Sequence, residues 1–92
     1  MPHYLIVYDI TEDKLRSEVS DMIKNCGGTR IQYSAFIVDL NEPELMVLLS
    51  RIKRLIGFRR ARLFVLPICR GDMRKRITIV HNYRIMEETP VI

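Results

Sequence analysis

The amino-acid sequence predicts an α+β sandwich in which two helices cover one face of an antiparallel sheet. Short apolar stretches rich in β-branched residues alternate with two stretches of helical periodicity, and each helical stretch ends at glycine. The chain has 92 residues and is 48% hydrophobic. A domain of this length buries only about 60–65% of its unfolded surface, so this apolar content indicates an oligomer.

The first strand is expected over residues 3–10, whose sequence is HYLIVYDI. Nearly every position is apolar or aromatic, as is typical of a central strand. The strand ends at Asp9, a carboxylate without a nearby sequence partner, where the chain passes into a helix. A carboxylate in this position can cap the turn or the helix, or it can bind a ligand. The local sequence alone favours the capping role.

The first helix is expected to follow Thr11, which can act as its N-cap, and to end at Gly27-Gly28. Its apolar residues recur with helical spacing and form one stripe. This stripe consists of Leu15, Val19, Met22, Ile23 and Cys26.

Residues 29–40 (TRIQYSAFIVDL) are expected to be extended. The pattern of polar and apolar side chains changes near Ser34. Either one strand bends there or two short strands meet in a tight turn, and the periodicity leaves both arrangements open.

The second helix is expected to begin at Asn41, with Glu44 completing a capping box, and to end at Gly57. Its apolar residues again share one face. They are Leu45, Leu48, Leu49, Ile52, Leu55 and Ile56.

A further buried strand is expected over residues 63–69, with Pro67 indicating the edge of the sheet. Residues 70–76 read as a polar connector, and residues 76–83 as a short final strand.

If residues 29–40 supply two strands, the order of elements is that of a ferredoxin-like βαββαβ sandwich with an extra C-terminal strand. Residues 1–92 then form one domain. Helices on one face leave the other face of the sheet bare, and its strands are too apolar to face water. A homodimer formed through the bare face is therefore expected.

The charges are divided unevenly between the two halves of the chain. Residues 1–46 carry four Lys/Arg against eight Asp/Glu, and residues 47–92 carry eleven against three. A basic half favours polyanions, of which nucleic acid is the most common, although a solvated basic face is the simpler alternative. The candidate nucleic-acid-binding residues are Arg51, Lys53, Arg54, Arg59, Arg60, Arg62, Arg74, Lys75 and Arg76.

Cys26 and Cys69 lack metal-ligand spacing and are expected to be reduced thiols of a cytoplasmic protein. No apolar run approaches the roughly 20 residues that cross a membrane, and no signal peptide is expected.

Asp9 is the strongest candidate for chemistry. In a two-fold dimer it can meet its own copy, and the two carboxylates repel each other unless a cation or a shared proton lies between them. A divalent ion there can activate water for phosphodiester cleavage. His3, His81 and Ser34 have no partner spacing that suggests a competing site, and no phosphate-binding glycine motif is present.

Several of these residues resemble the small CRISPR-associated "Cas two" family. The resemblance is carried by Tyr8-Asp9-Ile10 at the end of the first strand, by Arg16 and Gly28, and by the stretch RIQYSAF over residues 30–36. The chain length, the two helices and the strand LFVLPI in the last third agree, so the resemblance covers nearly the whole chain.

The resemblance implies a ferredoxin-like homodimer in which the C-terminal strand and tail, residues 77–92, contact the partner's sheet. It implies a Mg²⁺- or Mn²⁺-dependent endonuclease acting on single-stranded RNA or on DNA. By the family pattern, Asp9 is the metal or catalytic position, and Tyr8, Arg16, Arg30 and Phe36 support activity.

The resemblance also implies a second role for the family, as a dimeric, DNA-binding bridge between copies of the larger CRISPR integrase during spacer acquisition. This non-catalytic role is the main alternative to cleavage. A toxin-like ribonuclease acting outside CRISPR shares the fold and is a third alternative.

Overall fold

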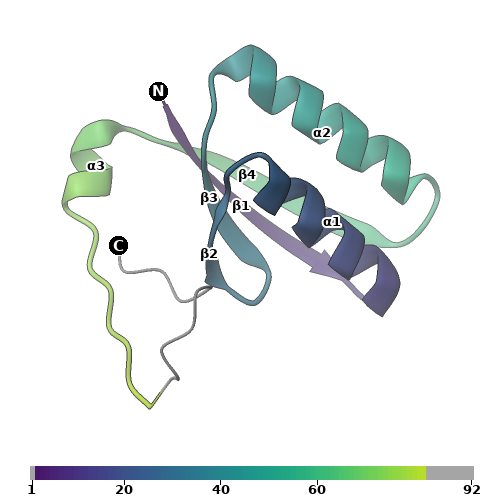
Figure 1. The fold of residues 1–92 in the computed structure, drawn as a ribbon, viewed down its shortest axis with the longest axis horizontal. Coiled ribbons are helices and arrows are strands. Elements are labelled where there is room, and N and C mark those ends of the chain that lie inside the picture. The colour runs from purple at the N-terminus through teal and green to yellow at the C-terminus, as the bar shows by residue number, and fades with distance from the viewer. Residues whose placement is uncertain (1, 83–92) are drawn as a thin grey trace.

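The computed structural model describes residues 2–82 and has the expected ferredoxin-like architecture (Figure 1). Its four strands are antiparallel and lie in the order β2-β3-β1-β4. The elements are β1 (His3–Ile10), α1 (Asp13–Asn25), β2 (Thr29–Gln32), β3 (Ala35–Asp39), α2 (Glu42–Ile56), β4 (Ala61–Ile68) and α3 (Arg70–Arg74).

Strand β1 is central, as predicted, because it pairs with β3 on one side and β4 on the other. Side chains alternate between the faces of a strand, so Ile6, Tyr8 and Ile10 point towards the helices and are buried. Val7 and Asp9 point to the opposite, open face. Two residues that are adjacent in sequence, Tyr8 and Asp9, therefore lie on different sides of the sheet.

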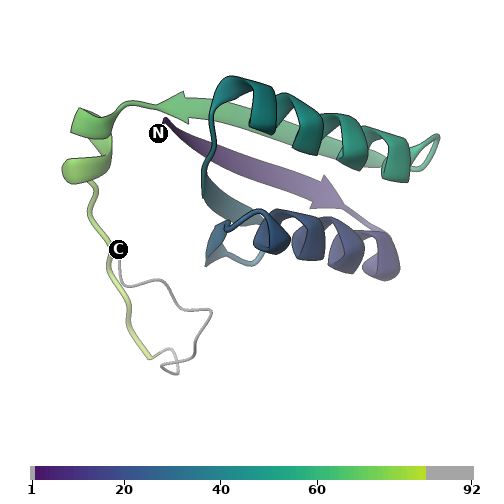
Figure 2. The same ribbon diagram turned by 45° about the horizontal axis from the view of Figure 1, so that its top comes forward.

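The core lies between the sheet and helices α1 and α2, which both lie on one side of it (Figure 2). The predicted helical stripes are confirmed. Leu15, Val19 and Ile23 of α1 and Leu45, Leu48 and Ile52 of α2 are buried, and the remaining stripe residues pack against them.

Helix α1 begins two residues after the predicted cap. Its N-cap is Glu12, whose side chain makes no capping hydrogen bond, so the expectation that Thr11 caps the helix is wrong. The end is as predicted, because Gly27 adopts a φ of +83°. The backbone N–H of Gly28 donates to the carbonyl of Ile23, and a Cβ at position 28 would lie 2.7 Å from the Ile23 side chain.

Helix α2 has the predicted capping box. The backbone N–H of Glu44 donates to Asn41 Oδ1 at 2.9 Å, and the backbone N–H of Asn41 donates to Glu44 Oε1 at 3.0 Å. Gly57, with a φ of +58°, ends the helix.

Residues 29–40 form two strands rather than one bent strand. Strands β2 and β3 pair as a hairpin around Tyr33 and Ser34, with an irregularity in register between Arg30 and Gln32. The Ser34 carbonyl accepts a hydrogen bond from the backbone N–H of Tyr8, which ties this turn to β1.

The C-terminal part differs from the prediction in two ways. Residues 70–74 form a short helix, because the Cys69 sulfur accepts a hydrogen bond from the backbone N–H of Asp72 and caps its first turn. Residues 76–82 lie beyond α3 and form no strand in the part of the chain that the structure describes (Figure 1). The rest of the predicted C-terminal segment, residues 83–92, lies outside the described residues.

Strand β4 starts at Ala61, two residues earlier than predicted, and lies at the edge of the sheet as Pro67 indicated. No helix within residues 2–82 has the length and apolar character needed to cross a membrane.

Candidate functional site

Asp9 lies near the end of β1 on the open face, and its side chain is 70% exposed. The register places it opposite Arg62 of β4, whose guanidinium donates to Asp9 Oδ2 at 2.9 Å. Asp9 does not cap α1, because the N-cap of that helix is Glu12 and no side chain caps it. An ion pair this exposed contributes little to stability, so water or a ligand can displace Arg62 at low cost.

The surface around this pair is a shallow depression. Val7, Tyr8, Asp9, Arg62, Leu63 and Phe64 line it. Val7 and Phe64 are opposite one another in register and both are exposed, so one side of the Asp9 carboxylate borders apolar surface.

Tyr8, Arg30 and Phe36 lie together on the helix side of the sheet, away from Asp9. The rings of Tyr8 and Phe36 stack with centroids 6.3 Å apart, and the Arg30 guanidinium carbon lies 5.1 Å from the Phe36 ring centre. Phe36 has no exposed surface. These residues support the sheet from its covered face and do not form one cluster with the Asp9 carboxylate.

The Tyr8 hydroxyl is buried. Burial raises the pKa of Tyr8 above its ordinary value, and hydrogen bonding with the nearby Arg30 guanidinium and its positive charge oppose part of this rise. Tyr8 is therefore a neutral, buried aromatic residue at physiological pH.

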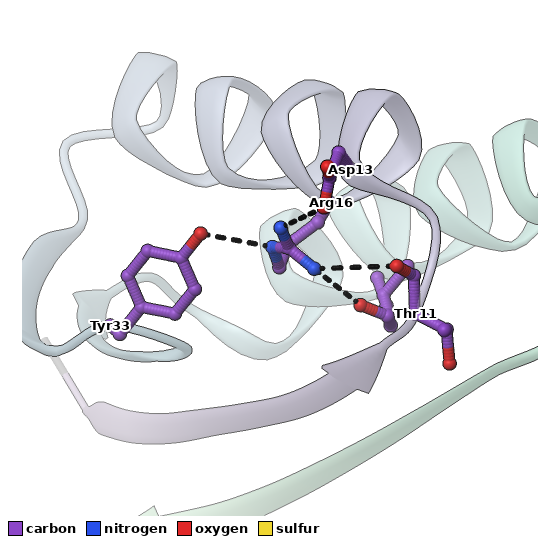
Figure 3. Close-up of polar contacts among 5 residues, drawn as sticks. Thr11, Asp13, Arg16 and Tyr33 are labelled. Carbon is purple, nitrogen blue, oxygen red and sulfur yellow. Dashed lines mark hydrogen bonds and ion pairs between the residues drawn. The ribbon is translucent and has the colours of Figure 1, made fainter.

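Arg16 joins three segments of the chain (Figure 3). Its guanidinium donates to the Ile10 carbonyl at 3.0 Å and to the Tyr33 hydroxyl at 3.2 Å, and it pairs with Asp13. Asp13 and Tyr33 hold the pKa of Arg16 above its ordinary value. Arg16 thus fixes the end of β1 against α1 and the β2–β3 turn, which positions the backbone next to Asp9.

The predicted nucleic-acid-binding residues fall into three groups. Arg51, Lys53 and Arg54 lie on the exposed side of α2, and Arg59, Arg60 and Arg62 follow at the Asp9 end of the sheet. Arg74, Lys75 and Arg76 lie beyond the opposite end of β4.

Two contacts of this site had no signal in the sequence. The pairing of Asp9 with Arg62 depends on the register of β1 and β4, which are separated by more than 50 positions. The contact of Tyr33 with Arg16 depends on the hairpin turn that brings the Tyr33 ring over the guanidinium, 5.3 Å from ring centre to carbon.

The described residues of one chain do not provide a complete metal site. Among residues 2–82, no group of three or more His, Cys, Asp or Glu side chains is placed to hold an ion. Asp9 is exposed, but a single carboxylate supplies too few of the oxygen ligands that Mg²⁺ requires.

Comparison with known proteins places the chain in a family. Residues 1–76 match the family model described as CRISPR associated protein Cas2. The chain belongs to the Cas2 family. Two relatives of this chain carry the name CRISPR-associated endoribonuclease Cas2. The Desulforudis audaxviator protein is 37% identical over 70 residues, which cover 76% of this chain and 66% of that one. The Korarchaeum cryptofilum protein is 39% identical over 70 residues, which cover 76% of this chain and 75% of that one.

Solved structures agree with the Cas2 fold. A hypothetical protein from Thermus thermophilus is 31% identical, with a TM-score of 0.68 over 74% of this chain and 82% of that one. Streptococcus pyogenes Cas2 at pH 6.5 is 20% identical, with a TM-score of 0.69 over 85% of this chain and 99% of that one. A chain of a partial Cas6-RT-Cas1–Cas2 complex is 22% identical, with a TM-score of 0.67 over 99% of this chain and 91% of that one. The last two likenesses concern the fold alone.

Proposed function

We propose that this Cas2-family protein is a metal-dependent endonuclease of CRISPR adaptation that cleaves phosphodiester bonds in single-stranded RNA or DNA. The observation that carries the proposal is Asp9, an exposed carboxylate at the end of a bare apolar sheet face and beside a basic loop. Relatives that carry the name endoribonuclease support the reaction class.

A second copy of the chain is the natural cover for the open face. Val7, Phe64 and Leu66 are exposed there on adjacent strands, and exposed apolar surface of this kind is stabilised by association. A two-fold axis that passes through this face near Asp9 would bring two Asp9 carboxylates to one site.

Two carboxylates plus water and substrate phosphate form a donor set that suits Mg²⁺ or Mn²⁺. The ion would supply Lewis acidity and lower the pKa of a bound water. The roles of this chain's own residues are then separate: Asp9 would hold the ion, Arg62 would pair with substrate phosphate in place of Asp9, and Arg16 fixes the strand end. Tyr8, Arg30 and Phe36 keep β1 in place from the covered face.

The test is cleavage of a labelled single-stranded oligonucleotide by the wild-type protein, by Asp9→Asn and by wild type with a chelator. Asp9→Asn keeps the shape of the side chain but removes its charge, so we expect at least a hundredfold loss of rate with an unchanged circular dichroism spectrum. Asp21→Asn, at an exposed position of α1, is the matched control. Cleavage that persists in Asp9→Asn or in chelator would refute the proposed metal site.

The second candidate is a non-catalytic bridge that binds duplex DNA in a complex with the larger CRISPR integrase. The favouring observation is the outward side of α2, where Arg51, Lys53 and Arg54 are all exposed. If the Asp9→Asn variant, together with the integrase, integrates spacers at the wild-type rate, the biological role is that of the bridge.

The bridge makes a separate prediction for binding. Arg51→Ala with Arg54→Ala should weaken duplex binding regardless of sequence and reduce the salt slope by about two units, because two phosphate contacts are lost. Lys14→Ala with Arg70→Ala removes the same charge elsewhere and should change the slope less. Equal changes in both double variants would indicate a general charge effect rather than a binding surface.

A further inference from the structure

The loop between α2 and β4 exposes an aromatic side chain that none of the roles above uses. Phe58 is fully exposed and is the most exposed large apolar residue in the part of the chain that the structure describes. Gly57 precedes it in the left-handed region, which allows the chain to leave α2 and project residue 58 outward. A ring with no apolar cover is unfavourable in water, so a ligand that covers it gains free energy.

The surroundings of Phe58 are basic. Lys53 and Arg54 lie in the last turn of α2, and Arg59 and Arg60 directly follow the ring in sequence. Arg59 is held in place, since it donates to Glu12 at 3.1 Å and to backbone carbonyls at the end of α2. Arg60 is exposed. An apolar protein surface docked on Phe58 would desolvate these cations, whereas a polyanion would pair with them.

The position of the loop relates it to Asp9. Arg62, four residues after Phe58, pairs with Asp9, and β4 starts opposite the last residue of β1. Figures 1 and 2 both show the α2–β4 loop at the end where β1 stops. A nucleic-acid strand that reaches Asp9 therefore passes close to this loop.

We infer that Phe58 stacks on an unpaired nucleobase of a single-stranded nucleic acid whose phosphates contact Arg60. An exposed ring flanked by cations is the combination by which proteins bind single strands. A duplex keeps its bases stacked on one another and offers the loop only phosphates. The inference rests on the proposed function and adds to it a subsite that favours single strands.

The test measures binding of a labelled single strand, and of the duplex of the same length, by fluorescence anisotropy. Every sample carries Asp9→Asn, so that binding is separated from the proposed cleavage. Phe58→Ala should weaken single-strand binding about tenfold, while duplex binding stays within about twofold. Phe58→Leu should lose nearly as much, because it keeps apolar area without a flat ring. Met46→Ala, at an exposed apolar position of α2, is the control and should change neither.

A second readout uses the absence of tryptophan from the chain. Phe58→Trp should retain single-strand affinity, and the single strand should quench its emission much more than the duplex does. Arg60→Ala should reduce the salt slope, which Phe58→Ala should leave unchanged.

The outcomes separate the inference from the proposed function. If the parent protein binds single strands and Phe58→Ala binds equally well, the inference is wrong and the proposed function stands. Full binding by Phe58→Leu would also overturn it, because apolar contact alone would then suffice. A protein that binds no single strand at all contradicts both.

Discussion

The two faces of the sheet are formed by alternate residues of the same strands, but one face is buried and the other is exposed. On the covered face, Ile6 and Phe36 have no exposed surface, whereas Val7 and Phe64 on the open face are 38% and 59% exposed. Alternation along each strand produces this difference. It separates the residues that the family resemblance groups together, with Tyr8, Arg30 and Phe36 on the covered side and Asp9 on the open side. Tyr8, Arg30 and Phe36 are therefore placed to support the fold, whereas Asp9 is accessible to a ligand.

The largest expected effect is on the covered face. Phe36→Ala should lower the free energy of unfolding by about 3–5 kcal/mol, because it leaves a cavity among fully buried side chains. Denaturant unfolding at two protein concentrations measures this, and the loss should be the same at both. A loss below about 1 kcal/mol would contradict the role of Phe36 in the core.

The next effect concerns association through the open face. Leu66→Asp places a charge among exposed apolar residues of this face and should weaken self-association at least tenfold in analytical ultracentrifugation. Val47→Asp, on the exposed side of α2, is the matched control and should leave association unchanged. Equal association of the two variants would exclude the open face as the dimer surface.

The next prediction concerns Arg16, one of the residues that carry the family resemblance, and asks whether it acts by holding the end of β1. Arg16→Ala removes the links from α1 to Ile10 and Tyr33, and should lower Tm by a few degrees and increase amide exchange at residues 10–13. Tyr33→Phe removes one of these links and should have a smaller effect in the same direction. A reduced salt slope for nucleic-acid binding with unchanged exchange would instead identify Arg16 as a phosphate contact.

The smallest effect is the pH dependence that Tyr8 contributes. Its pKa is raised by burial, so the folded state holds the phenolic proton more tightly than the unfolded state does. This contribution is complete below about pH 10 and is lost as the pH rises further. Tyr8→Phe should therefore leave stability at pH 7 nearly unchanged and reduce its decline above pH 10, as measured by urea unfolding. An unchanged alkaline decline would contradict the burial of the hydroxyl.

Local sequence signals predicted most of the fold. The capping box at Asn41 and the glycines after each helix act through neighbouring residues, so they could be recognised without tertiary information. The two strands of residues 29–40 could not be separated, because the turn at Ser34 depends on a backbone hydrogen bond with β1.

For the candidate site, the sequence could place residues on a strand or a helix but could not give their contacts. Asp9 could be identified as an unpaired carboxylate at a strand end, but its Arg62 partner comes from the long-range register. Arg16 could be placed on the helix, yet its contact with Tyr33 depends on a hairpin. Within residues 2–82, the stretch after residue 76 does not join the four-stranded sheet, and the local sequence could not show this because strand pairing depends on a distant neighbour.

The most direct test of the central claim, that two Asp9 carboxylates on paired open faces form one site, is a mixing experiment. Wild-type protein is allowed to exchange subunits with an equal amount of Asp9→Asn, and cleavage of a single-stranded oligonucleotide is compared with that of the same wild-type protein alone. If both carboxylates are needed, mixed dimers are inactive and the rate falls to about one half. An unchanged rate would show that each Asp9 acts alone and would contradict the claim.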